Sequence, residues 1–225
     1  MLRDNGLSLS VGALFLVTLL GHFLSGRLEF NAEQLVHGGA SVGYMAYATT
    51  GHFVESVFEN WESEFLQMGL YVLMTAYLVQ RGSAESRKPA DEQLITGTPN
   101  ESDDDLSTHQ SDADAPWPVK RGGWIARWYA FSLTVAFLLL FLFSFVGHVM
   151  GGVVDYNESL RAHGAPTITT LQYATTSRLW FESFQNWQSE FLSVLAIVVL
   201  SIWLRQKGSP ESKPVHKPHR ETGAC

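Results

Sequence analysis

The seven residues NWESEFL, from Asn60 to Leu66, open an apolar run, and NWQSEFL, from Asn186 to Leu192, opens a second one 126 positions later. The same offset aligns further matching segments without a gap over about eighty residues. These segments are Gly21-His22 with Gly147-His148, YATT (47–50) with YATT (173–176), and QRGSAES (80–86) with QKGSPES (206–212). The spacing therefore predicts a tandem duplication of one unit.

The composition indicates a small multispanning membrane protein. Of the 225 residues, 46% are hydrophobic, and they gather in four runs, while most charged residues lie between the second and third runs and in the tail. The net charge of -7 is local, because acidic residues crowd one linker. This distribution offers no basic surface for nucleic acid. The single cysteine, Cys225, excludes an intrachain disulfide and a thiolate zinc centre.

The predicted fold is an all-α membrane protein with four transmembrane helices, arranged as two parallel copies of a two-helix unit. The first run resembles a signal peptide, but the repeat aligns it with the third run and favours a membrane helix. Twelve of the fifteen Lys and Arg residues fall at the termini or beside the central linker. By the positive-inside rule, both termini and the linker are cytoplasmic.

The predicted domain organisation follows the repeat. Residues 1–82 form the first two-helix membrane repeat and residues 121–208 the second. Residues 83–120, rich in Asp, Ser, Thr and Pro, form an acidic disordered cytoplasmic linker, and residues 209–225 form a disordered cytoplasmic tail.

Ionisable residues repeated at the edge of the apolar runs are the candidate functional residues. Counting along helices from the cytoplasmic boundary places His22 and Glu64 at a similar depth near the outer face. The duplication places His148 and Glu190 at that same depth. The predicted metal ligands are His22, Glu64, His148 and Glu190, with Asn60, Asn186, Thr18 and Ser144 in supporting positions.

Two classes of function remain open for this predicted cluster. Two imidazoles and two carboxylates suit a divalent ion such as zinc, manganese or iron, and equally suit a proton relay, so one hypothesis is a small-cation binding or transport module. Transport through four spans would require a homo-oligomer. The alternative is a noncatalytic structural or partner-binding protein in which the paired polar residues fix helix packing. No catalytic motif is present, so we expect no enzyme activity.

The repeated NW-x-SEFL and the segments QRGSAES and QKGSPES resemble a family of bacterial integral membrane proteins, domain of unknown function 6766. The resemblance covers both repeats. It implies a location in the bacterial inner membrane, with the lipid bilayer as the surrounding partner. Since the family has no assigned activity, the resemblance identifies no catalytic or binding residue.

Overall fold

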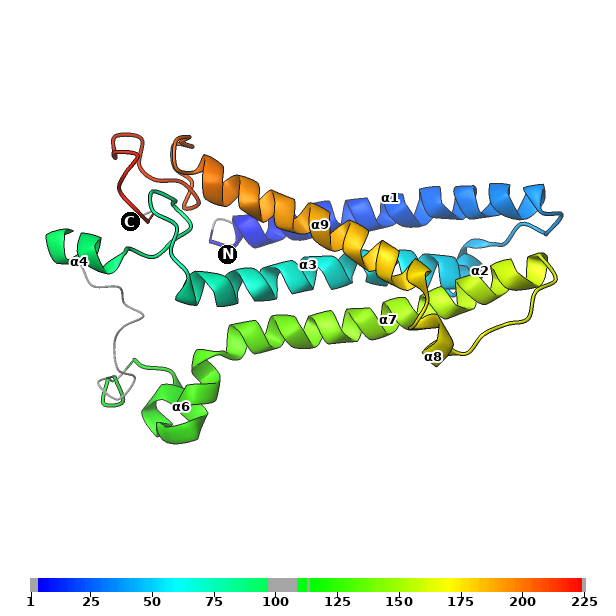
Figure 1. Cartoon of the computed structure of the whole chain (residues 1–225), viewed down its shortest axis with the longest axis horizontal. Coiled ribbons are helices and arrows are strands. Elements are labelled where there is room, and N and C mark those ends of the chain that lie inside the picture. Colours follow the sequence, from blue (N-terminus) through cyan, green and yellow to red (C-terminus); the bar gives the residue numbers. More distant parts are fainter. Residues whose placement is uncertain (1–3, 97–108, 113, 224–225) are drawn as a thin grey trace. The chain divides into compact units, whose positions relative to one another are not determined.

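A computed structural model describes residues 4–96, 109–112 and 114–223, and the described residues are helical, without strands (Figure 1). Part of the predicted linker, residues 97–108 and 113, and Cys225 lie outside this description. The elements in chain order are α1 (Gly6–Val36), α2 (Tyr44–Tyr47), α3 (Gly51–Tyr77), α4 (Ala90–Thr96), α5 (Trp117–Arg121), α6 (Gly123–Ala130), α7 (Ser132–Ala162), α8 (Thr170–Tyr173) and α9 (Ser177–Leu200).

Two of the described helices, α1 and α7, are long and apolar enough to cross a membrane. Each has 31 residues, and none of the most apolar window of α1 is buried within the chain. Apolar side chains left uncovered over such a length need a nonaqueous environment or a partner. The predicted helical class is confirmed for the described residues, and two of the four predicted spans, α1 and α7, have the length and composition to cross a membrane.

The chain divides into two compact units, and each unit takes residues from both predicted repeats. The first contains Met1–Trp61 and Ser144–Glu182, and the second contains Glu62–Phe143 and Ser183–Cys225. The first unit thus holds α1, α2, α8 and the adjoining ends of α3, α7 and α9. The candidate functional site lies within this first unit.

Matching asparagines shape the two long loops of the first unit. The Asn31 side chain donates to the carbonyl of Val42 at 3.1 Å and accepts from its N–H at 2.7 Å. Asn157 makes the same pair of bonds with Ile168, at 2.9 and 2.8 Å. In each pair, the asparagine amide takes the place of water as the hydrogen-bond partner of the N–H and the C=O of one loop residue. Each loop is therefore held against the long helix that precedes it.

Short helices α2 and α8 place two tyrosines in the interior, since Tyr47 and Tyr173 are both fully buried. After them come Thr50 and Thr176, whose hydroxyls accept from the N–H three residues later, at 3.3 and 3.5 Å. These are N-cap contacts at the starts of α3 and α9. The caps let the chain reverse direction directly after each buried tyrosine.

Helices α3 and α7 pack closely in the first unit because glycines line their contact. A Cβ at Gly51 would collide with the backbone of α7, and one at Gly151 would collide with the backbone of Glu55. A Cβ at Gly147 would overlap the ring of Phe58. Gly147 and Gly151 have the small-xxx-small spacing that lets membrane helices approach closely. This approach brings Glu55 onto the surface of α7.

The second unit contains two equivalent turns and an ordered part of the tail. The N–H of Gln80 donates to the Ser86 hydroxyl at 2.8 Å, and Gln206 donates to Ser212 at the same distance. The buried amino group of Lys213 donates to the carbonyls of Gly82, His219 and Glu221. The described parts of the linker and tail therefore make defined contacts, while the predicted domain limits stay predictions.

Candidate metal centre

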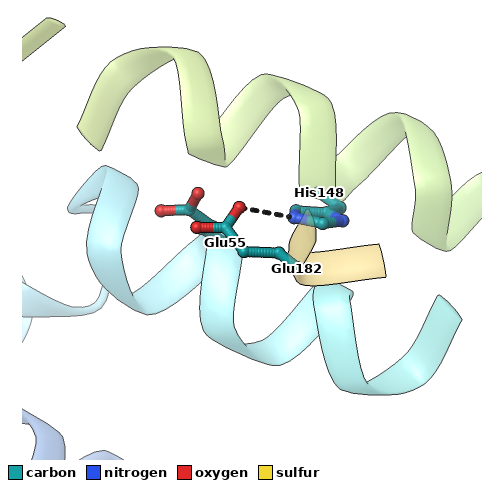
Figure 2. A group of neighbouring side chains, drawn as sticks. All are labelled: Glu55, His148 and Glu182. Carbon is teal, nitrogen blue, oxygen red and sulfur yellow. Dashed lines mark ion pairs between the residues drawn. The ribbon is translucent and has the colours of Figure 1, made fainter. Parts of the chain in front are cut away.

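Three ionisable side chains from three helices meet in the first unit: Glu55 of α3, His148 of α7 and Glu182 of α9 (Figure 2). Each offers one ligand atom, and these atoms all lie within 4.8 Å of one another. His148 is fully buried, and its Nε2 lies 3.6 Å from Oε2 of Glu182. An imidazole with two carboxylates is a ligand set used for zinc, manganese and iron.

Arg178, one turn before Glu182 on α9, fixes the orientation of the acidic groups. Its Nε donates to Oε1 of Glu182 at 2.8 Å, and its Nη2 donates to Asp155 at 2.9 Å. Nη2 also lies 3.4 Å from Oε2 of Glu55. Since one guanidinium faces three carboxylates, the group retains excess negative charge when all three are ionised.

The hydroxyl of Tyr173 selects one oxygen of Glu55. It donates to Oε1 of Glu55 at 2.9 Å, whereas Oε2 of Glu182 is 3.4 Å away. A phenol has one proton to donate, so the shorter contact with Glu55 takes it. The Oε1 atom of each carboxylate therefore makes the shorter hydrogen bond, while Oε2 of Glu55 and Oε2 of Glu182 make longer contacts of 3.4 Å with Arg178 and Tyr173.

Glu55, Tyr173, Arg178 and Glu182 lie on segments that precede the predicted second spans, and their environment changes their proton affinities. Burial, together with the charges of Asp155 and Glu182, raises the pKa of Glu55 to about 7, although Arg178 acts in the opposite direction. Burial also works against the ionised form of Glu182, but hydrogen bonds to His148 and Arg178 hold its pKa below the usual value. Two carboxylates in one cluster thus differ in acidity.

Glycine at position 152 leaves room for the cluster. A methyl group there would overlap the hydroxyl of Tyr173 and would lie 2.7 Å from Oε1 of Glu55. Any side chain at this position would displace either the tyrosine or the carboxylate. The sequence Gly151-Gly152 therefore serves both the helix contact and the polar site.

The family described as domain of unknown function DUF6766 matches residues 1–224. The chain belongs to this family. The suspected resemblance to DUF6766 is therefore confirmed, and it covers both repeats, the linker and the tail. No curated protein and no solved structure matches this DUF6766 chain. Any assignment of function therefore rests on the geometry of the chain's own residues.

Of the sequence-predicted residues in the first unit of the DUF6766 chain, His148 belongs to the cluster and His22 makes a different contact. Nε2 of His22 lies 3.0 Å from the hydroxyl of Ser56. Thr18 bonds the carbonyls of its own helix, at 2.9 and 3.0 Å. Ser144 is buried, and its hydroxyl has no hydrogen-bond partner in the described part of the chain.

The predicted glutamates belong to the second unit, so the convergence of all four predicted ligands stays a prediction. Glu64 is exposed and Glu190 is half-buried. The carbonyl of Glu190 accepts from Gln67 at 3.1 Å. The amide of Asn60 donates to the carbonyl of Ser56 in its own helix, and the carbonyl of Asn186 accepts from Ser189.

Four residues around the cluster were missed because they differ between the predicted repeats, whereas Tyr173 was missed although it is repeated as Tyr47. At the offset of 126, Glu55 is aligned with Phe181, and Glu182 with Ser56. The remaining three, Asp155, Arg178 and Tyr173, are aligned with Glu29, His52 and Tyr47. The sequence did contain an indication of the charged contacts, because an acidic and a basic residue stand at the same two positions of each predicted repeat. In the structure these residues pair, Glu29 with His52 and Asp155 with Arg178. The Gly147-xxx-Gly151 spacing was a second indication.

Proposed function

We propose that the chain is a multi-pass membrane protein that binds one divalent metal ion through Glu55, His148 and Glu182. The observation that carries the proposal is the meeting of three ligand atoms from three helices within 4.8 Å. A nitrogen and two oxygens at this spacing need small side-chain adjustments to surround an ion that takes bonds of about 2.0–2.2 Å. We propose binding, and no enzyme activity.

The membrane part of the proposal extends the two apolar helices to four. Helices α3 and α9 follow α1 and α7 at the same offset, after equivalent asparagine bonds and threonine caps. These equivalences support a duplicated two-helix unit in which the apolar part of each second helix, following Asn60 in α3 and Asn186 in α9, also spans the membrane. With an even number of spans in each unit, the basic residues favour cytoplasmic termini in a bacterial inner membrane.

The neighbours of the cluster suit a metal site. Arg178 and Tyr173 hold the Oε1 atoms of Glu182 and Glu55, as a second layer of hydrogen bonds does around bound ions. A divalent ion between the Oε2 atoms and His148 would balance the carboxylate charge that one arginine leaves over. In this arrangement, Arg178 stays paired with Asp155 when the ion binds.

A second candidate is a packing role without a ligand, and the same arginine favours it. Arg178 contacts all three carboxylates, so the chain supplies a counter-ion of its own. In that case the cluster would only join α3, α7 and α9. The two candidate functions predict different metal contents for the purified protein, and different effects on metal content when a carboxylate is removed.

The deciding experiment measures metal per chain by elemental mass spectrometry on full-length protein purified in detergent without a histidine tag. We expect near-stoichiometric metal in the parent and none in a folded Glu55→Gln/Glu182→Gln variant. The matched control is Glu64→Gln/Glu190→Gln, which changes the sequence-predicted pair and should keep the metal. The opposite pattern would move the site to Glu64 and Glu190. No metal in any protein would support the packing role.

A further inference from the structure

The first unit contains a pocket of about 450 Å³ at the ends of its long helices, and its lining is rich in metal-ligating side chains. We call it the helix-end pocket. Its ionisable lining residues are Glu33, His37, His52, Asp155, Glu158, Arg161, His163 and Arg178. Since Asp155 is paired with Arg178 at 2.9 Å, the remaining charged groups are two carboxylates and one guanidinium, which favours a cation.

Two histidines of this pocket face each other from equivalent positions in the two sequence repeats. The ring centres of His37 and His163 are 6.1 Å apart. His37 caps the end of α1 and His163 follows α7, and each precedes a glycine with positive φ, 75° at Gly38 and 68° at Gly164. Glycine adopts this left-handed conformation without strain, so the two helices end sharply at the histidines.

The distance between the rings suits a shared metal ion. A Zn–N bond of about 2.0–2.1 Å places the centres of two imidazoles on one ion roughly 5–6 Å apart. Both histidines are exposed, so their side chains can rotate and water can complete the coordination. A small change in side-chain angles therefore suffices, without movement of the helices.

Two local features prepare the ligands. Nδ1 of His163 lies 2.8 Å from the carbonyl oxygen of Ser159, so this nitrogen carries the hydrogen and Nε2 keeps a lone pair for a metal. Glu33 precedes His37 by four positions, at the end of the same helix, and lines the same pocket. Residues at this spacing project from one face of a helix.

We propose that the helix-end pocket is a second, solvent-accessible site for a transition-metal ion, with His37 and His163 as ligands and Glu33 as a third. Imidazole ligands favour Zn²⁺, Cu²⁺ or Ni²⁺ over Mg²⁺ and Ca²⁺. The other histidine of the pocket, His52, is already bonded to Tyr47 and Glu29, at 3.1 and 3.3 Å, and does not take part. This site requires none of the residues of the buried cluster.

The test is a titration of untagged, detergent-purified protein with Zn²⁺, and separately with Mg²⁺, followed by calorimetry. In the Glu55→Gln/Glu182→Gln background, we expect one Zn²⁺ site and no Mg²⁺ site. His37→Ala and His163→Ala should each weaken the Zn²⁺ site about tenfold or more. Glu33→Gln should weaken it less. The matched control is His216→Ala, which changes an exposed histidine of the tail and should leave binding intact.

The outcomes separate this proposal from the buried site. If the double variant does not fold, the same histidine changes are made in the parent, where they should remove the exchangeable Zn²⁺ and leave any metal that was purified with the protein. Unchanged Zn²⁺ affinity in both His37→Ala and His163→Ala would overturn the helix-end site. Loss of the purified metal alone, in Glu55→Gln/Glu182→Gln, concerns only the buried cluster.

Discussion

The two predicted repeats contain the same set of polar contacts, but only the second has an arginine and three carboxylates at these contacts. In the first, Glu29 pairs with His52 at 3.3 Å and His22 meets Ser56 at 3.0 Å. In the second, the equivalent pairs are Asp155 with Arg178 at 2.9 Å and His148 with Glu182 at 3.6 Å. A glutamate in place of a serine, and an arginine in place of a histidine, add one carboxylate and one permanent cation to this framework.

Glu55 accounts for the largest difference between the polar contacts of the two predicted repeats. It comes from the first repeat but contacts Tyr173 and Arg178 of the second. Its counterpart by sequence offset is Phe181, which is exposed. The equivalent positions of the predicted first repeat therefore hold one acidic residue, Glu29, against three around Arg178, and the two clusters are chemically distinct. The predictions below test that distinction.

The largest expected effect is the loss of Arg178. Arg178→Ala would leave Glu55, Asp155 and Glu182 without their cation. Breaking a fully buried charge pair costs about 3–5 kcal/mol, and since the Arg178 side chain is 34% exposed, we expect a loss below that range. We expect the thermal unfolding midpoint of the detergent-solubilised protein to fall strongly. Adding Glu55→Gln should recover part of the loss, because one of the unpaired charges is then gone. An unchanged midpoint in Arg178→Ala would mean that the cluster carries little charge.

The pH dependence of stability should come next. Since burial raises the pKa of Glu55 from 4.5 to about 7, the folded chain binds this proton more tightly than the unfolded chain. The stability contributed by Glu55 is therefore full below pH 4.5 and is lost as the pH rises through 7, by an amount on the order of 3 kcal/mol. Glu182, whose pKa is lowered, contributes stability that is lost only as the pH falls below its usual value.

The measurement compares unfolding of the parent and Glu55→Gln from pH 4.5 to 8, with a chelator present to exclude metals. Glu55→Gln should be the less pH-sensitive protein across this range. If both proteins lose stability in parallel as the pH rises, another group is responsible for the dependence.

The fold was more predictable than the site, for a reason visible in particular residues. Identity between repeats singled out His148, because its counterpart His22 is the same residue. It could not single out Glu55 or Glu182, which have no acidic counterpart. Counting residues from a membrane boundary set His22 level with Glu64, whereas its contact on α3 is Ser56, eight positions earlier. The loop between α1 and α3 sets which residue of α3 lies beside His22. The lengths of the apolar runs contain no information on this alignment.

A smaller effect is expected where the helix contact differs between repeats. Gly147 and Gly21 are equivalent by offset, but a Cβ at Gly147 meets the ring of Phe58, and one at Gly21 meets open space. Gly147→Ala should therefore destabilise the protein by roughly 1–3 kcal/mol through overpacking. Gly21→Ala should be neutral or slightly stabilising, because alanine favours a helix. Thermal unfolding of the two variants side by side checks this, and equal losses would contradict close packing at Gly147.

The smallest effect is expected for the first-repeat counterpart of Arg178. The side chain of Glu29 is 70% exposed, so its ion pair with His52 is screened by water. Exposed pairs contribute about 0–1 kcal/mol, and the bond from His52 to the Tyr47 hydroxyl adds a similar amount. His52→Ala should thus lower the unfolding midpoint far less than Arg178→Ala, in the same detergent and buffer. A loss as large as that of Arg178→Ala would show that both repeats depend equally on their central base. The charged cluster would then be a packing device common to both, which would weaken the case for a ligand in the second.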